Sequence, residues 1–168
     1  LDDDIILDKY CIEELVNCIS KENKRSVGPK IFGLDNKYHS PRVKSKKNSF
    51  YEKFIFYLLN GKEGYIKGKI SLSGIAFGVP NSDSDLEVDW LPGACILHNN
   101  NNLVNYNFYP YKGKAYSEDI LHSKILKQNK ISLIRSGTAK CIIDLKSGTS
   151  FSNVLYEFFN VLRIGFHI

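Results

Sequence analysis

Three adjacent aspartates near the start of the chain are the first candidates for chemistry. Asp2, Asp3 and Asp4 precede the apolar run at residues 5–7 in "LDDDIIL". On an extended segment alternate side chains share a face, so Asp2 and Asp4 would point one way and Asp3 the other. Two carboxylates on one face offer hard oxygen ligands for Mg²⁺ or Mn²⁺ and leave positions open for substrate phosphates. The alternative is a helix-preceding cap, and an EF-hand is excluded because the loop lacks the required glycine and distal Glu.

A second pair of carboxylates, Glu118 and Asp119, stands at an expected helix start in "SEDIL". Acidic residues in a first turn commonly compensate the helix dipole. A carboxylate held there beside a second one would also make a positioned general base. The residues alone leave both interpretations open.

The stretch "DWLPGAC" places Trp90 just before a turn at Pro92 and Gly93. A tryptophan in this position is either a packing anchor or an aromatic face for a sugar ring. Two histidines, His98 and His122, are interpreted as core or surface residues rather than ligands.

The elements that must position these residues follow from periodicity. The stretch "DKYCIEELVNCISKENK" predicts a helix over residues 8–24, with Asp8 as N-cap and lysines near its end. Its apolar face is expected to hold four residues: Ile12, Leu15, Val16 and Ile19. A short apolar helix is expected over residues 50–60.

The second half of the chain predicts alternating strands and helices. Loops around short strands are expected over 65–90, a buried strand over 94–97 and an exposed asparagine loop over 99–102. A helix over 116–130 would be capped by Ser117. Two strands at 131–136 and 139–145 follow, and then an amphipathic helix whose stripe holds Phe151, Leu155, Phe158 and Leu162.

Composition is that of one globular domain. The 168 residues are 43% hydrophobic and 24% charged, with a net charge of +5 that suits a nucleic acid, an anionic membrane or a phosphorylated substrate. A basic loop over 33–49 carries five cations: Lys37, Arg42, Lys44, Lys46 and Lys47. The four cysteines form no C-x-x-C pair, so free thiols in a reducing cytoplasm are expected. No apolar run is long enough to cross a bilayer.

In this order and spacing, "LDDDI", "SLSGIAFGVP", "VDWLPGACILH" and "FYPYKGKAYSEDILHSKILKQNKISLI" resemble the bacterial family-two glycosyltransferases with the GT-A fold. The resemblance extends from Leu1 to about Asp144. It implies an α/β fold, a GT-A-like mixed sheet flanked by helices, forming a single domain over residues 1–168. That domain would be the second half of such an enzyme, starting at the D-x-D motif and lacking the N-terminal nucleotide-binding half.

The resemblance also implies an activity: inverting transfer of a sugar from a nucleotide-sugar donor to a saccharide or lipid-linked acceptor in bacterial surface polysaccharide synthesis. The implied roles are metal binding (Mn²⁺ or Mg²⁺) by Asp2 and Asp4, and donor binding by Asp3. Asp119 would be the general base, and Glu118 would orient it or the acceptor. The acceptor pocket would be shaped by Trp90, Pro92 and Gly93.

One feature departs from the family pattern. Such enzymes often carry a His after the strand that follows the Glu-Asp helix, whereas Asp144 stands near that place here. Two alternatives to the enzyme remain: an inactive glycosyltransferase-like fragment, and a basic nucleic-acid-binding module using the loop at 37–47 with Tyr38, Phe50 and Tyr51. The nucleic-acid reading leaves both carboxylate groups unexplained, so an enzyme without a nucleic-acid partner is preferred. We expect it in the cytoplasm, with peripheral contact at the inner face of the membrane through the basic loop.

Overall fold

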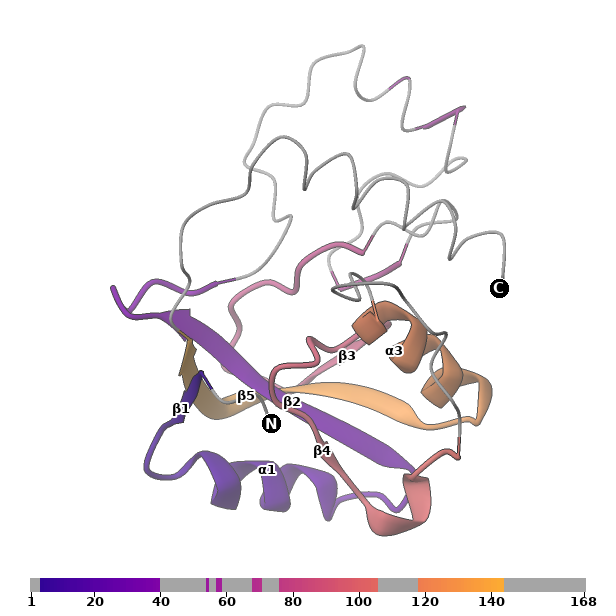
Figure 1. Ribbon diagram of the computed structural model, residues 1–168, viewed down its shortest axis with the longest axis horizontal. Coiled ribbons are helices and arrows are strands. Elements are labelled where there is room, and N and C mark those ends of the chain that lie inside the picture. The colour runs from indigo at the N-terminus through magenta and orange to yellow at the C-terminus, as the bar shows by residue number, and fades with distance from the viewer. Residues whose placement is uncertain are drawn as a thin grey trace.

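The computed structural model describes residues 4–39, 54, 57–58, 68–70, 76–105 and 118–143. Within these ranges the chain forms a mixed five-stranded sheet with two helices (Figure 1). The elements in chain order are β1 (Ile5–Leu7), α1 (Cys11–Ile19), β2 (Arg25–Gly33), β3 (Leu86–Val88), β4 (Leu97–His98), a 3₁₀ turn η1 (Asn100–Asn102), α3 (Glu118–Gln128) and β5 (Ser132–Ile143).

Strand β5 organises the sheet. The strand order is β1-β5-β2-β4, and β3 also pairs with β5. Strands β2 and β5 are parallel, whereas the other pairs are antiparallel. Since β2 occupies one edge of β5, strands β3 and β1 share the other edge, at Leu133–Arg135 and Cys141–Ile143 respectively. The predicted mixed α/β architecture is confirmed.

The two helices cover opposite faces of the sheet. Cys11, Leu15 and Cys18 of α1 share a buried cluster with Ile134 of β5. The neighbouring residue Leu133 belongs instead to the cluster that contains Leu126 of α3. Successive side chains of a strand point to opposite faces, so α1 and α3 lie on either side of β5.

A bulge interrupts the pairing of β2 with β5. The register runs from Arg25 opposite Ser132 to Gly28 opposite Arg135, and resumes with Lys30 opposite Lys140. Four residues of β5 therefore stand opposite Pro29 alone. Proline has no N–H to donate to a ladder, so it is tolerated where the pairing is already broken. The strands predicted over 131–136 and 139–145 are the two halves of β5, on either side of this bulge.

Helix α1 differs in detail from its prediction. It begins at Cys11, with Tyr10 at the cap position, and the Asp8 carboxylate accepts from the Tyr10 N–H (3.3 Å) instead of capping the helix. No basic residue lies in its last turn.

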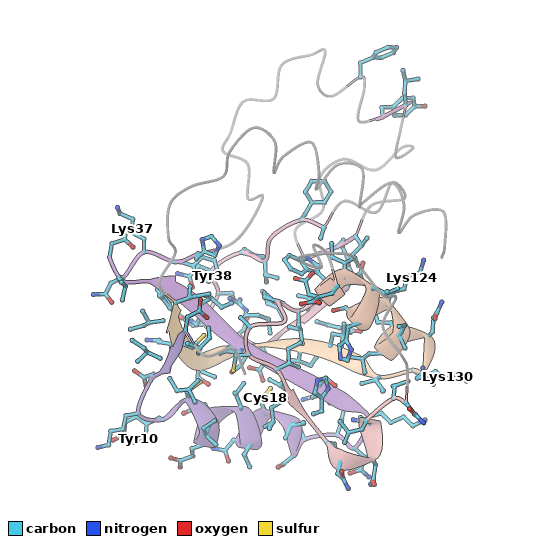
Figure 2. The ribbon with its side chains drawn as sticks, viewed as in Figure 1. Tyr10, Cys18, Lys37, Tyr38, Lys124 and Lys130 are labelled. Carbon is cyan, nitrogen blue, oxygen red and sulfur yellow. The ribbon has the colours of Figure 1, made fainter. Side chains whose placement is uncertain are left out.

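The buried stripe of α1 also differs from the predicted one. It is Cys11, Leu15 and Cys18, while Ile12 and Val16 are 52% and 45% exposed. Cysteine behaves as a small apolar side chain, so periodicity alone could not choose between two stripes that share Leu15. Figure 2 shows Cys18 on the sheet side of α1 and Tyr10 directed away from it.

Two further expectations need correction, and one element was not predicted. No element was predicted over residues 25–32, where the structure has most of β2. The strand expected over 94–97 is reduced to β4 at Leu97–His98. Asn102 is buried rather than exposed, because its side-chain amide donates to the carbonyls of Asn23 and Arg25, both at 3.0 Å.

Asp4, the described aspartate of the first motif, lies in a turn that leads into β1, whereas the aspartates were considered on an extended segment. Of the helix expected over 50–60, Phe54, Tyr57 and Leu58 are described and are helical. The basic loop from residue 40 onward and the C-terminal helix over 151–162 lie outside the described residues. Within the described ranges, no helix has the length and apolar character needed to cross a membrane.

Candidate active site

The first turn of α3 carries the two predicted catalytic carboxylates. Glu118 is exposed and Asp119 is half-buried. The Ile120 N–H donates to Asp119 Oδ1 (2.9 Å), so the carboxylate lies against the free N–H groups at the helix start. The expected cap, Ser117, lies outside the described residues. A carboxylate held in this way has the rigid support that a general base requires.

Trp90 is a packing anchor beside this turn. Its side chain is 4% exposed, and its Nε1–H donates to the Phe77 carbonyl (2.9 Å). It shares a small core with Ala76 and Ile120, the residue that follows Asp119. The indole therefore shapes this region from beneath the surface, which is the first of the two roles predicted for it.

The turn after Trp90 reaches the start of α3. Pro92 is half-buried and Gly93 is exposed. A Cβ placed on Gly93 would lie 3.6 Å from the Asp119 Cβ, an ordinary van der Waals distance. The "WLPG" and "ED" motifs, which are separate in sequence, thus form one surface in the folded chain.

Asp89 joins three segments at the other end of this region. Its Oδ1 accepts from Lys69 Nζ (3.2 Å) and from Lys127 Nζ of α3, and its Oδ2 accepts from the Ile70 N–H (3.3 Å). Burial raises the pKa of Asp89. The hydrogen bond and charge of Lys127, together with the hydrogen bonds from the Ile70 N–H and Lys69, outweigh burial, so the pKa is lowered overall. Asp89 is therefore anionic at neutral pH.

Ser123 makes a contact midway between the Gly93–Asp119 contact and the Asp89–Lys127 ion pair. Its side chain is fully buried, and its Oγ accepts a hydrogen bond from the Leu91 N–H (3.1 Å). Sequence reasoning missed Asp89 and Ser123. The available signal was the spacing of Asp119, Ser123 and Lys127, which are four residues apart and so share a helix face.

A pair of histidines joins α3 to β4. The rings of His98 in β4 and His122 in α3 are 5.3 Å apart between centroids and meet edge to face. Ser26 Oγ and His98 Nδ1 are joined by a 2.9 Å hydrogen bond. Burial lowers the pKa of both imidazoles, and the charge of His122 lowers the pKa of His98 further. Both histidines were predicted to be core or surface residues, and both are half-buried, whereas their contact was not predicted.

The predicted metal ligands are only partly described. Asp4 is exposed in the turn before β1, so its oxygens are accessible, and Asp2 and Asp3 lie outside the described residues. The chemistry of three adjacent carboxylates fits Mn²⁺ or Mg²⁺. Among the residues that the structure describes, no cluster of three His, Cys, Asp or Glu side chains could hold a metal ion, so ligands besides Asp4 would come from Asp2 or from the bound substrate.

Asp4 and Asp119 lie on different elements around β5. Asp4 precedes β1, which pairs with the Cys141–Ile143 end of β5, whereas Asp119 lies in the first turn of α3, at the end of the helix opposite to the one that leads into Ser132. Figure 1 shows β1 at the left of the molecule and α3 at the right.

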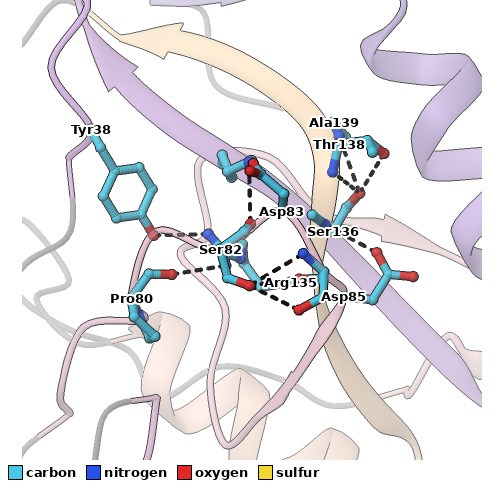
Figure 3. Close-up of polar contacts among 12 residues, drawn as sticks. Tyr38, Pro80, Ser82, Asp83, Asp85, Arg135, Ser136, Thr138 and Ala139 are labelled. Atoms are coloured by element: carbon cyan, nitrogen blue, oxygen red, sulfur yellow. Dashed lines mark hydrogen bonds and ion pairs between the residues drawn. The ribbon is translucent and has the colours of Figure 1, made fainter.

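Two buried cations hold the segment that leads into this site. Lys30 is 3% exposed, and its Nζ donates to Asp83 Oδ1 (2.8 Å) and to the Ser82 carbonyl (3.2 Å). Arg135 is 2% exposed and donates to Tyr38 Oη (3.0 Å) and the Pro80 carbonyl (2.9 Å). Figure 3 shows Tyr38 and Pro80 approaching the Arg135 guanidinium. Their partners at Pro80–Asp83 thus lie fixed over the bulge of β5.

Comparison with protein-family models and with curated proteins found no match to this chain.

Proposed function

We propose that this protein is an inverting glycosyltransferase that moves a sugar from a nucleotide-sugar donor to a hydroxyl of a saccharide or lipid-linked acceptor. One observation carries the proposal: the exposed Gly93 turn lies against Asp119 at the start of α3. An acceptor seated on the Pro92 and Gly93 turn would bring its hydroxyl next to the carboxylate that must deprotonate it. The bacterial family-two resemblance and a place in surface polysaccharide synthesis belong to the same proposal.

The residues divide the reaction between them. Asp119 takes the proton from the acceptor hydroxyl as the hydroxyl attacks the anomeric carbon, and Glu118 orients the acceptor. Asp2 and Asp4 would hold Mn²⁺ or Mg²⁺, which neutralises charge on the departing nucleoside diphosphate. Asp3 contacts the donor. Trp90 supports the acceptor turn from the core.

The contacts of Tyr38 weaken the nucleic-acid alternative, which relied on this side chain for base stacking. Tyr38 Oη donates to the Val79 carbonyl (2.9 Å), and its ring meets Phe32 edge to face. Base stacking needs an exposed aromatic face. Tyr38 instead connects the end of β2 to the segment around Val79, so it serves the fold.

The proposal is tested by separating base from metal in the intact protein. Asp119→Asn should retain Mn²⁺-dependent binding of a nucleoside diphosphate and lower the transfer rate about a hundredfold or more, the scale of a lost general base. Asp4→Asn should weaken Mn²⁺ and nucleoside diphosphate binding together. The measurements are titration calorimetry with a panel of nucleoside diphosphates and release of nucleoside diphosphate from the matching sugar donors.

Glu22→Gln is the matched control, because Glu22 is an exposed carboxylate that pairs with Arg25 (3.1 Å) at the start of β2, at the opposite end of the sheet from β1. It should change neither readout. Wild-type transfer by Asp119→Asn would show that the base is another residue, and unfolding of that variant would show that the carboxylate is a structural cap. Absence of any Mn²⁺-dependent nucleoside diphosphate binding by the wild-type protein would contradict the proposed function.

A further inference from the structure

Three contacts join the segment from Asp89 to Gly93 to helix α3. Asp89 pairs with Lys127, the Leu91 N–H donates to Ser123, and Gly93 lies against Asp119. Along the segment the contacts involve every second residue. Along α3 they involve every fourth residue, in the reverse direction. The segment therefore lies antiparallel to one face of the helix.

The spacing of these contacts follows from backbone geometry. Two residues of extended chain advance by about 6.6 Å, and four residues of an α-helix advance by about 6.0 Å. Between the bend at Asp89 and the turn at Gly93, residues 90–92 can thus keep step with one helix face. Asp119, Ser123 and Lys127 occupy that face. The three contacts define a single register between the segment and α3.

The middle contact is the one that the core enforces. Leu91 and Ser123 are both fully buried, so the Leu91 N–H has no access to water and depends on the Ser123 oxygen. A slip of one residue would bring Trp90 or Pro92 to Ser123, and proline has no N–H to donate. The ion pair of Asp89 and Lys127 secures the far end of the same register.

We propose that Ser123 and Asp89 are positioning residues that set where the Gly93 turn lies relative to Asp119. Neither residue touches the reacting atoms. Each acts through the segment it holds, and the result is the placement of the acceptor hydroxyl beside its base. The catalytic meaning of this register rests on the proposed function, whereas the register itself is a property of the fold and can be tested without any activity.

A disulfide reports the register directly. The 3.6 Å between the Gly93 and Asp119 Cβ positions is within the range of disulfides, so Gly93→Cys with Asp119→Cys should form one on mild oxidation. Cys95 is replaced by alanine in this background to remove the neighbouring thiol. The measured quantity is the effective concentration of the two thiols against glutathione, read in the intact protein.

Removing the buried acceptor should loosen the register. Ser123→Ala in the two-cysteine background should lower the effective concentration by about tenfold, the equivalent of one hydrogen bond. Ser123→Thr retains the hydroxyl and should restore most of it. Asp89→Asn, which removes the charge facing Lys127, should lower it by a smaller factor and serves as the second variant if the buried serine tolerates no change.

The control separates register from stability. Ile134→Val removes one methyl group from the core on the α1 face, so it should lower stability and leave the effective concentration unchanged. If no disulfide forms with Ser123 intact, or if Ser123→Ala and Asp89→Asn both leave its effective concentration unchanged, the proposal is overturned.

The enzyme gives a second readout in the protein with its native Gly93 and Asp119. Ser123→Ala should lower kcat while KM for the donor stays near its wild-type value, because the donor ligands in the proposed function are Asp2, Asp3 and Asp4. Equal effects on both constants would overturn the positioning role. If the disulfide responds as expected but the wild-type protein transfers no sugar, the register stands and the proposed function fails.

Discussion

At Gly137 the segment leading into the site lies so close to β5 that no side chain fits between them. A Cβ at this position would lie 2.3 Å from the Asp83 carbonyl oxygen, and the Gly137 N–H donates to Asp85 Oδ1 (3.0 Å). Cβ atoms do not approach backbone atoms this closely in folded proteins, so either β5 or the segment around Asp83 would have to move. Gly93, by contrast, has room for a methyl group beside Asp119.

We therefore expect Gly137→Ala to lower the free energy of unfolding by about 1–3 kcal/mol, the usual scale of overpacking. Gly93→Ala should change it by less than about 0.5 kcal/mol, as for an open surface position. Urea unfolding followed by circular dichroism measures both. An equal loss in the two variants would mean that the close approach at Gly137 is not a feature of the folded protein in solution.

At the scale of elements, β4 and α3 meet through His98 and His122. Since burial lowers the pKa of both imidazoles, the unfolded chain takes up protons at a higher pH than the folded one. Stability therefore rises with pH wherever the unfolded state binds more protons. This contribution is complete above the ordinary histidine pKa of 6.5 and is lost as the pH falls below it.

Replacement of one imidazole should reduce this dependence. His98→Asn keeps a polar side chain facing Ser26 but cannot titrate, so its stability should change less between pH 7.5 and pH 5 than that of the wild type. The comparison is made by urea unfolding at each pH, with Ser26→Ala as the control that removes the hydrogen bond and leaves both imidazoles in place. A wild-type pH dependence in His98→Asn would show that this pair does not govern it.

At the scale of the whole molecule, thiols from three separate elements meet in one core. Cys11 of α1, Cys95 before β4 and Cys141 of β5 belong to the same buried cluster. Burial raises the pKa of Cys11 to about 11 and that of Cys141 to about 12, with the neighbouring thiols adding to the effect. The free thiols expected from the cysteine spacing are observed.

Two results should follow from this burial. Ellman's reagent should not react quickly with the native protein, whereas an added Ser20→Cys, at an exposed position after α1, should react at once. Stability should fall as the pH rises above about 9, because unfolded thiols ionise there while the native ones keep their protons, so the unfolded state binds fewer protons. Prompt labelling of all native cysteines would contradict this account of the core.

Much of the local structure followed from the sequence. The helix start at Glu118, the acidic first turn of α3 and the mixed α/β character were predicted, because helix periodicity and end signals are local properties. The extent of β2 and the unity of β5 were not. Gly28 and Pro29 are typical of loops. In β2, a Cβ at Gly28 would lie 3.1 Å from Leu91 Cδ2, so a glycine suits this position, and the bulge removes the need for a Pro29 N–H.

The candidate site divides in the same way. The residue types and the family resemblance suggested the proposed roles of Asp2–Asp4, Trp90, Gly93, Glu118 and Asp119. Which of them meet was decided by packing. Gly93 lies beside Asp119 because Leu91 and Ser123 bury a hydrogen bond between them and Asp89 pairs with Lys127. The four-residue spacing of Asp119, Ser123 and Lys127 indicates that they share a helix face. Which residues that face contacts is decided by the tertiary structure, because the partners are far away in the sequence.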